Sequence, residues 1–104
     1  MDNYYLKKND LVDLDQLIFL EALENYTLFH LNDGTKVISS LTLKRHEEKL
    51  SGRNFLRVNR SMLINSQFIN SVILQKDKHF ICLLNGHLIK VSRRRMDTIL
   101  EWAS

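Results

Sequence analysis

Arginine side chains in two short stretches are the residues of this sequence best suited to ligand chemistry. The first stretch, FLRVNRSMLIN at 55–65, contains Arg57 and Arg60, and the second, VSRRR at 91–95, ends in three consecutive arginines. A guanidinium stays charged and presents its N–H donors in a planar fork that matches the oxygens of a phosphate or a carboxylate. Both stretches are therefore candidate anion-binding sites. Whether their arginine side chains can reach a ligand depends on the helices, strands and turns that carry them.

The first stretch starts like a β-strand and then loses the two-residue period of a strand. The break falls at Asn59, Arg60 and Ser61, a polar trio that turns the chain between two apolar runs. Since burying an unpaired guanidinium costs several kcal/mol, we expect Arg60 to project from this turn. Two interpretations stay open for Arg57: a ligand-binding side chain, or a structural arginine at the sheet edge paired with a carboxylate. Ser61 and Asn65 are expected to satisfy the backbone of the turn with their side chains.

Two helices are predicted. One, at about 42–50, begins at Thr42, which can cap it, and ends before Gly52. The other, at about 94–103, follows from the spacing of three and four residues between apolar side chains after VSRRR. A helix start already carries partial positive charge, so arginines there weaken the helix slightly and make its end attractive to phosphate.

The rest of the chain is predicted to be mostly β. Runs of β-branched, aromatic and other apolar residues predict strands at 4–7, 16–22, 26–31, 36–39, 55–58, 68–75 and in a last hairpin. Asp33-Gly34 and Asn85-Gly86 favour two-residue hairpin turns in which both central residues have positive φ.

Length and composition limit the class of protein. The 104 residues suffice for one domain, predicted to span 1–104, and are too few for two. Cys82 is the only cysteine, so a disulfide framework is excluded and a reducing cytoplasm is the expected location. No apolar run approaches the roughly 18 residues of a membrane span. We therefore expect a soluble cytoplasmic protein.

The charge of the chain is unevenly distributed. Residues 1–38 carry three Lys against seven Asp or Glu, a net charge of −4, whereas residues 39–104 carry twelve Lys or Arg against five acids, a net charge of +7. Such asymmetry suggests a polyanionic partner, with a solvated surface as the alternative. Nucleic acid comes before a membrane, because the sequence has no basic amphipathic stretch with bulky apolar residues opposite.

Three motifs occur in a defined order along the chain. EALENYT comes first, F-x-R-x-x-R-S-x-x-x-N follows from Phe55 to Asn65 with Ile69 close behind, and VSRR stands at 91–94. With the hairpin glycines, this order resembles the LytTR family, the LytR/AlgR-type DNA-binding domain, over nearly the whole chain. The resemblance implies an elongated, mostly antiparallel β fold of about ten short strands in stacked small sheets, with one or two short helices.

The resemblance also implies a function. Members of this family bind double-stranded DNA by placing loops into two successive major grooves and a third loop against the backbone of the minor groove between them. They usually follow a phosphorylated receiver domain in two-component signalling, and they bind paired repeats as dimers. We therefore expect sequence-specific DNA binding in transcriptional regulation, as the output domain of a response regulator or as a free-standing regulator. No catalytic activity, cofactor or metal is implied.

Site residues follow from the same resemblance. The first base-reading loop corresponds to LENYT, in which Asn25 reaches the groove beside Tyr26; asparagine pairs with adenine N6 and N7, although a turn-forming role is the alternative. Arg60 takes the phosphate-facing or minor-groove position. Arg94 takes the base-contacting position of the third loop, where arginine binds guanine O6 and N7.

Four further cations have two possible roles each. Arg93 and Arg95 are expected to contact phosphate or to form a solvated face. Lys44 and Arg45 lie on the predicted short helix, where they are candidates for phosphate contacts, with a solvated helical face as the alternative.

Other classes of function fit the residues less well. The chain has no H-E-x-x-H, no G-x-S-x-G and no glycine-rich phosphate loop, which argues against an enzyme. A protein-interaction β module that uses an exposed strand edge has no reason to gather arginines at two loops and a helix start. A non-specific single-strand binder would interleave aromatic and basic residues, whereas the phenylalanines lie in strand-like runs. The last two classes remain the alternatives to specific DNA binding.

Overall fold

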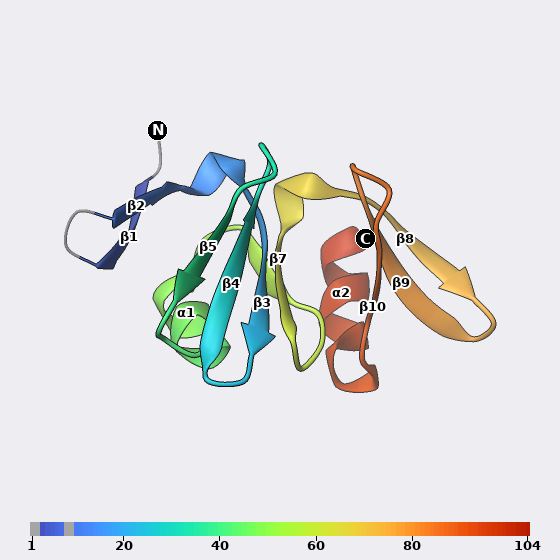
Figure 1. Cartoon of the computed structure of the whole chain (residues 1–104). Helices are drawn as coiled ribbons and strands as arrows, with labels where there is room; N and C mark the ends of the chain where they lie inside the picture. Colours follow the sequence, from blue (N-terminus) through green and yellow to red (C-terminus); the bar gives the residue numbers. More distant parts are fainter. Residues whose placement is uncertain (1–2, 8–9) are drawn as a thin grey trace.

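Ten β-strands in three antiparallel sheets, with two α-helices and three 3-10 turns, make up the computed structural model, which describes residues 3–7 and 10–104. The sheets lie in a row along a molecule of 44 × 24 × 23 Å (Figure 1). The strands are β1 (Asn3–Lys7), β2 (Asp10–Asp13), β3 (Leu17–Leu23), β4 (Tyr26–Leu31), β5 (Lys36–Ser39), β6 (Phe55–Arg57), β7 (Met62–Asn65), β8 (Ile69–Gln75), β9 (Lys78–Leu83) and β10 (Leu88–Lys90). The predicted elongated, mostly β fold in small sheets is confirmed.

The five-stranded sheet, in the order β5-β4-β3-β7-β6, forms the middle of the molecule. Its strand β3 is buried on both faces, which explains the continuous apolar run LIFL at its start. Leu17 and Leu20 pack into one core with the β1-β2 sheet, while Ile18 and Phe19 pack into a second core with the three-stranded sheet β10-β9-β8. One strand therefore joins both cores and makes the row of sheets a rigid scaffold.

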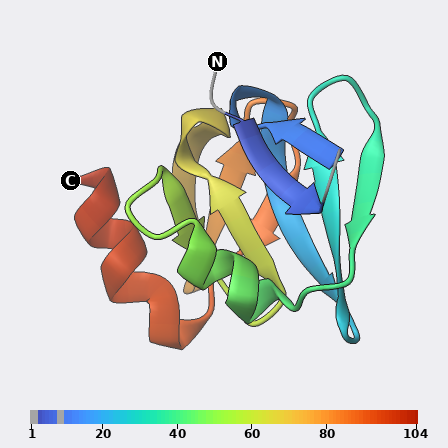
Figure 2. The ribbon, with the colours of Figure 1, turned by 90° about the vertical axis from the view of Figure 1, so that its left-hand side faces the viewer.

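Each core is closed by one helix. Helix α1 (Leu43–Lys49) is capped by Thr42, whose hydroxyl accepts from the Arg45 amide, and its Leu43 side chain is buried in the first core. Helix α2 (Met96–Ala103) buries Ile99 in the second core. In Figure 2 both helices lie on one flank of the molecule and β4 and β5 on the other. No helix in the described part of the chain is long and apolar enough to cross a membrane.

The two glycine hairpins have longer turns than the sequence predicts. Leu31 donates to the carbonyl of Thr35 and accepts from Gly34, both at 3.0 Å, so the β4–β5 connection spans 32–34. The connection at 84–86 repeats this pattern of hydrogen bonds. Only the glycine of each dipeptide has positive φ, +89° for Gly34 and +92° for Gly86. The prediction of two-residue turns was therefore wrong, and a left-handed glycine instead closes a three-residue connection.

A two-residue turn with two positive φ values does occur, but between β8 and β9. Lys76 (φ +52°) and Asp77 (φ +64°) form it without any glycine, so the sequence contains no turn dipeptide that predicts it. Strand β2 was likewise not predicted. Helix α2 begins at Met96, two residues later than expected, because Arg93–Arg95 form a 3-10 turn.

Candidate nucleic-acid interface

Three connecting segments lie along the lower edge of the molecule in Figure 1, and a fourth, the β8–β9 turn, lies at its right-hand end. They are the β3–β4 turn at 24–25, the loop at 59–61, the 3-10 turn η3 (Arg93–Arg95) and the β8–β9 turn at 76–77. Backbone hydrogen bonds connect the first three of these segments or the residues beside them. Ala22 donates to the carbonyl of Ser61 at 2.8 Å, and Ser92 donates to the carbonyl of Val58 at 2.9 Å. We call this set of four segments the loop edge.

Three of the four segments surround an open groove of about 990 Å³. Apolar side chains, among them Ile89 and Val91, form part of its lining. Its charged residues are Arg60, Lys76, Lys78, Lys90, Arg93 and Arg94, with Asp77 as the one carboxylate. All six basic residues are exposed. Because six cations face one acid, the groove attracts polyanions.

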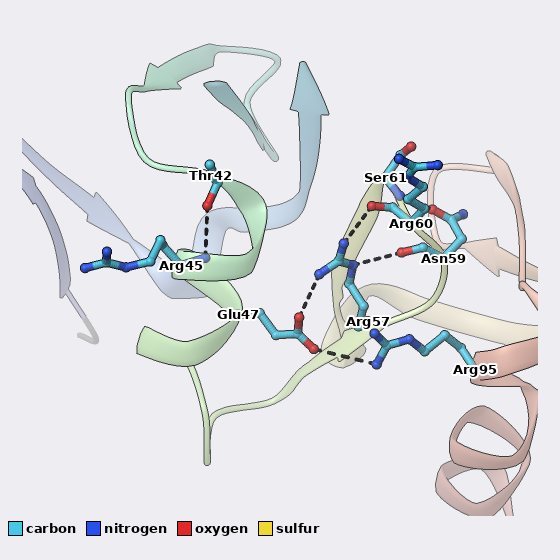
Figure 3. Close-up of polar contacts among 8 residues, drawn as sticks. All are labelled: Thr42, Arg45, Glu47, Arg57, Asn59, Arg60, Ser61 and Arg95. Carbon is cyan, nitrogen blue, oxygen red and sulfur yellow. Dashed lines mark hydrogen bonds and ion pairs between the residues drawn. The ribbon is translucent and has the colours of Figure 1, made fainter. Parts of the chain in front are cut away.

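Arg57 holds the loop at 59–61 from behind (Figure 3). Its Nε donates to the carbonyl of Asn59 at 2.8 Å and its Nη2 to the carbonyl of Arg60 at 2.6 Å. Its Nη1 donates to Oε1 of Glu47 at 2.7 Å. The side chain is 13% exposed, and β6, which carries it, is an edge strand. Of the two interpretations of Arg57, the structural arginine at the sheet edge, paired with a carboxylate, is confirmed.

The side chain of Asn59 closes the loop. Its Oδ1 accepts from the Ser61 amide at 2.8 Å, and its Nδ2 donates to the carbonyl of Lys90 at 2.8 Å, which ties the loop to β10. The sequence assigned this closing role to Ser61, whose hydroxyl makes no hydrogen bond within the described residues. Asn65 has the structural role expected of it, since its Oδ1 accepts from the Gln67 amide at 3.0 Å.

Arg60 projects from the loop, as the sequence predicted. Its residue is exposed, and within the described residues its guanidinium has neither a hydrogen bond nor an ion pair. Two side chains, those of Arg57 and Asn59, thus fix the backbone of the loop and leave one free cation at its tip (Figure 3). A fixed backbone with a free cation suits an anion-binding position, because little order must be gained on binding.

The three arginines of η3 have different surroundings. Arg93 and Arg94 are exposed and line the groove. Arg95 turns toward helix α1, where its Nη1 lies 3.7 Å from Oε2 of Glu47, and its side chain is 37% exposed. Arg95 therefore has a carboxylate partner within the protein, and its contact with phosphate stays a prediction.

Asn25 and Tyr26 lie at the β3–β4 turn, outside the groove but on the loop edge. Glu24 adopts a positive φ of +54°, which allows the tight connection between paired residues Leu23 and Tyr26. Asn25 is exposed, and the Tyr26 side chain is 52% exposed. Both side chains are available to a ligand.

Lys44 and Arg45 are exposed on helix α1 and do not line the groove. Figure 3 shows Arg45 directed away from Arg57 and Arg60. A solvated helical face is the better account of Arg45, and the structure does not bring Lys44 together with the groove residues.

Sequence reasoning missed three lysines of the groove. Lys76 lies in the β8–β9 turn, Lys78 follows it at the start of β9, and Lys90 stands at the end of β10. The sequence Lys-Asp-Lys between two apolar runs was the available signal, but it contains no turn-forming glycine.

Exposed cations presented by short turns on a β scaffold suit a nucleic-acid-binding module. The model of the LytTr DNA-binding domain family matches residues 7–104, so the chain belongs to this family, which consists of DNA-binding domains and not of enzymes. The resemblance found in the sequence is thereby confirmed, together with DNA binding in transcription regulation.

A solved structure supports the fold. The chain is similar to a LytTr DNA-binding domain from a Bacillus cereus protein described as a methyl-accepting/DNA response regulator. The two share 20% sequence identity at a TM-score of 0.80, over 97% of this chain and 95% of that chain. At this identity the likeness shows the fold alone. No curated protein sequence matches the chain significantly.

Proposed function

We propose that this domain reads a specific sequence of double-stranded DNA by placing its loop edge into two successive major grooves. The observation that carries the proposal is the row of turns in Figure 1, in which the β3–β4 turn and η3 flank the loop at 59–61. Each of these three segments offers at least one exposed polar or basic side chain to a ligand. Such a row matches a duplex, whose grooves and backbones alternate along its axis.

The docking sets the length of DNA that the loop edge must follow. One turn of B-DNA measures roughly 34 Å, which is the distance between successive major grooves on one face. The molecule is 44 Å long, and the loop edge follows its long direction in Figure 1. In the proposed docking the two flanking segments enter neighbouring major grooves, while the loop between them meets the backbone along the minor groove.

The side chains of the loop edge receive different roles in this proposal. Asn25 and Arg94 contact bases, because amide and guanidinium groups match adenine and guanine edges in the major groove. Tyr26 lies beside the first base contact. Arg60 and Arg93 contact phosphates and set the register of the domain on the duplex.

The lysines of the groove extend the phosphate-binding surface. Lys76, Lys78 and Lys90 line it together with the arginines. Lysine offers a compact point charge on a flexible stem, which suits sequence-independent attraction to the DNA backbone. Lys44 remains a weaker candidate for such a contact, since it lies outside the groove.

The assembly that we propose is a dimer of this single domain, in the cytoplasm, on paired DNA repeats. A receiver domain on the same polypeptide or a free-standing regulator are both compatible with it. The protein from Bacillus cereus, described as a response regulator, supports the first form. Two-fold protein symmetry would then appear as repeated half-sites in the DNA.

Selection from a library of random duplexes tests this function without a known target. The winning duplex and a scrambled duplex are then titrated at several salt concentrations. We expect a winner with two spaced repeats, bound at least about a thousandfold more tightly than the scramble. Weak binding that vanishes as salt rises, without any winner, would leave only electrostatic attachment. No binding to any duplex would return the protein-interaction module to first place.

A further inference from the structure

One acidic side chain of helix α1 contacts both Arg57, which holds the loop at 59–61, and Arg95 in η3. Glu47 stands on helix α1, and its side chain is 33% exposed. One carboxylate oxygen accepts from Arg57 at 2.7 Å, and the other lies 3.7 Å from Nη1 of Arg95 (Figure 3). Glu48, the next residue, is exposed and makes no side-chain contact within the described residues. Glu47 therefore contacts two arginines, whereas its neighbour Glu48, a residue of the same type, contacts none in the described part of the chain.

The contact with Arg57 reaches the tip of the loop at 59–61 through two further hydrogen bonds. With Nη1 bound to Glu47, the planar guanidinium presents Nε and Nη2 to the carbonyls of Asn59 and Arg60, at 2.8 and 2.6 Å. A guanidinium is planar, so fixing one nitrogen sets the direction of the other two. Glu47 thereby sets the backbone direction from which the Arg60 side chain projects.

The contact with Arg95 reaches η3, the second basic segment. Arg95 follows directly on Arg93 and Arg94, which line the groove. The residue at the start of η3, Ser92, makes no side-chain cap for this turn. Its attachment rests on the backbone bond from Ser92 to Val58, on the packing of the flanking Val91 and Met96 in the second core, and on the ion pair with Glu47.

We propose that Glu47 is a positioning residue for DNA binding, which holds the loop at 59–61 and η3 in the relative placement that one duplex requires. This inference rests on the proposed function. Electrostatics alone predicts the opposite effect, because a carboxylate near a phosphate-binding surface repels the ligand and weakens binding. Removing Glu47 should lower the affinity for DNA if the residue positions the loops, and should raise the affinity if only its charge matters. The direction of the change therefore tests the proposal.

The test compares Glu47→Ala with Glu48→Ala, which removes the same charge from the same helix. Affinity for the selected duplex is measured at several salt concentrations. We expect Glu47→Ala to lower the affinity about tenfold, as the loss of one or two charge-assisted hydrogen bonds would. The salt slope, which is the steepness of log affinity against log salt concentration, should fall by up to about one unit, because Arg60 is no longer held at its phosphate. Glu48→Ala should leave the affinity unchanged or raise it slightly, without lowering the salt slope.

Conservative variants separate positioning from loss of the fold. Glu47→Gln keeps one acceptor for Arg57 and should recover part of the affinity. Arg57→Lys keeps the charge but loses the planar fork, so it should weaken binding as Glu47→Ala does. The double variant should lose less than the sum of the two single losses, since both changes break the contact between Glu47 and Arg57, while the contact with Arg95 is lost only with Glu47. Thermal unfolding of each variant gives the temperature range in which all are folded and comparable.

The possible outcomes distinguish this inference from the proposed function. If the natural protein selects a duplex and Glu47→Ala binds it as well as Glu48→Ala does, the positioning role is wrong and the proposed function stands. If the two changes at Glu47 and Arg57 are additive, Glu47 does not act through Arg57. If the natural protein binds no duplex, both proposals fail together.

Discussion

The phenol of Tyr4 and Nδ1 of His46 lie 2.7 Å apart in the core, although 42 residues separate them in the sequence. The other ring nitrogen of His46 lies 2.8 Å from the hydroxyl of Ser39. One buried imidazole therefore joins the β1-β2 sheet to β5 through helix α1. A neutral imidazole has one donor and one acceptor nitrogen, which matches these two hydroxyl partners.

This arrangement makes the stability of the protein depend on pH. Burial, with a smaller contribution from the charge of Lys49, lowers the pKa of His46 from 6.5 to about 4. Between these values the unfolded chain binds a proton that the folded chain does not. The free energy of unfolding should therefore fall as the pH drops from about 6.5 to about 4, by up to about 3 kcal/mol in all. Urea unfolding at a series of pH values measures this.

His46→Gln is the control for that prediction. The variant is less stable at every pH, because it loses the fit to Tyr4 and Ser39. Between about pH 5 and 6.5 its free energy of unfolding should nevertheless change less steeply with pH than that of the natural protein. The difference in slope corresponds to about one bound proton. Equal slopes in the two proteins would mean that His46 titrates normally in the folded state.

Asn65→Ala should lower the free energy of unfolding by about 2 to 3 kcal/mol. Asn65 is 2% exposed, and its Nδ2 donates to the carbonyls of Leu14 and Leu17 at 3.2 and 2.9 Å. Removing the amide leaves buried carbonyls without this donor and frees the turn at Gln67. Chemical denaturation measures this loss. Asn70→Ala, at an exposed position, is the control and should change the free energy of unfolding by less than about 0.5 kcal/mol.

Arg94→Ala should cost roughly 1 to 3 kcal/mol on the selected duplex and flatten the preference at one base pair, as expected for the loss of a bidentate guanine contact. Binding to duplexes that carry each of the four base pairs at every position measures this. Arg93→Ala removes the same charge from the adjacent residue and should weaken all duplexes alike. A uniform loss for Arg94→Ala as well would remove its base-reading role.

Arg60→Ala should weaken the binding of all duplexes about equally and lower the salt slope by about one unit, as the loss of one phosphate contact does. The measurement is a titration of selected and scrambled duplexes against salt. Arg45→Ala also removes one positive charge, but from a side chain directed away from the loop edge (Figure 3), so its salt slope should stay nearly unchanged. Equal effects of both variants would assign the binding to net charge and not to position.

Local patterns in the sequence were sufficient for most of the elements. The cap at Thr42 and the apolar spacing predicted α1 within one residue at each end, because the signals of a short helix lie within the helix itself. The two glycine hairpins were correctly located, but their turn lengths were wrong, because the register of the strands and not the dipeptide decides the connection. The turn at Lys76 and Asp77 was missed because pairing of β8 with β9 imposes its positive φ values on ordinary residues.

The sequence by itself determined the family of this protein, the location of its candidate DNA-contacting loops and the exposure of Arg60, because these follow from residue types and spacings within short segments. Only the tertiary structure decided which other arginines are free. Arg57 and Arg95 have the same side chain as Arg94, but both lie within reach of Glu47 on a separate helix, whereas Arg94 faces the groove. Pairing with a carboxylate depends on a distance across the fold, and no local pattern contains that distance.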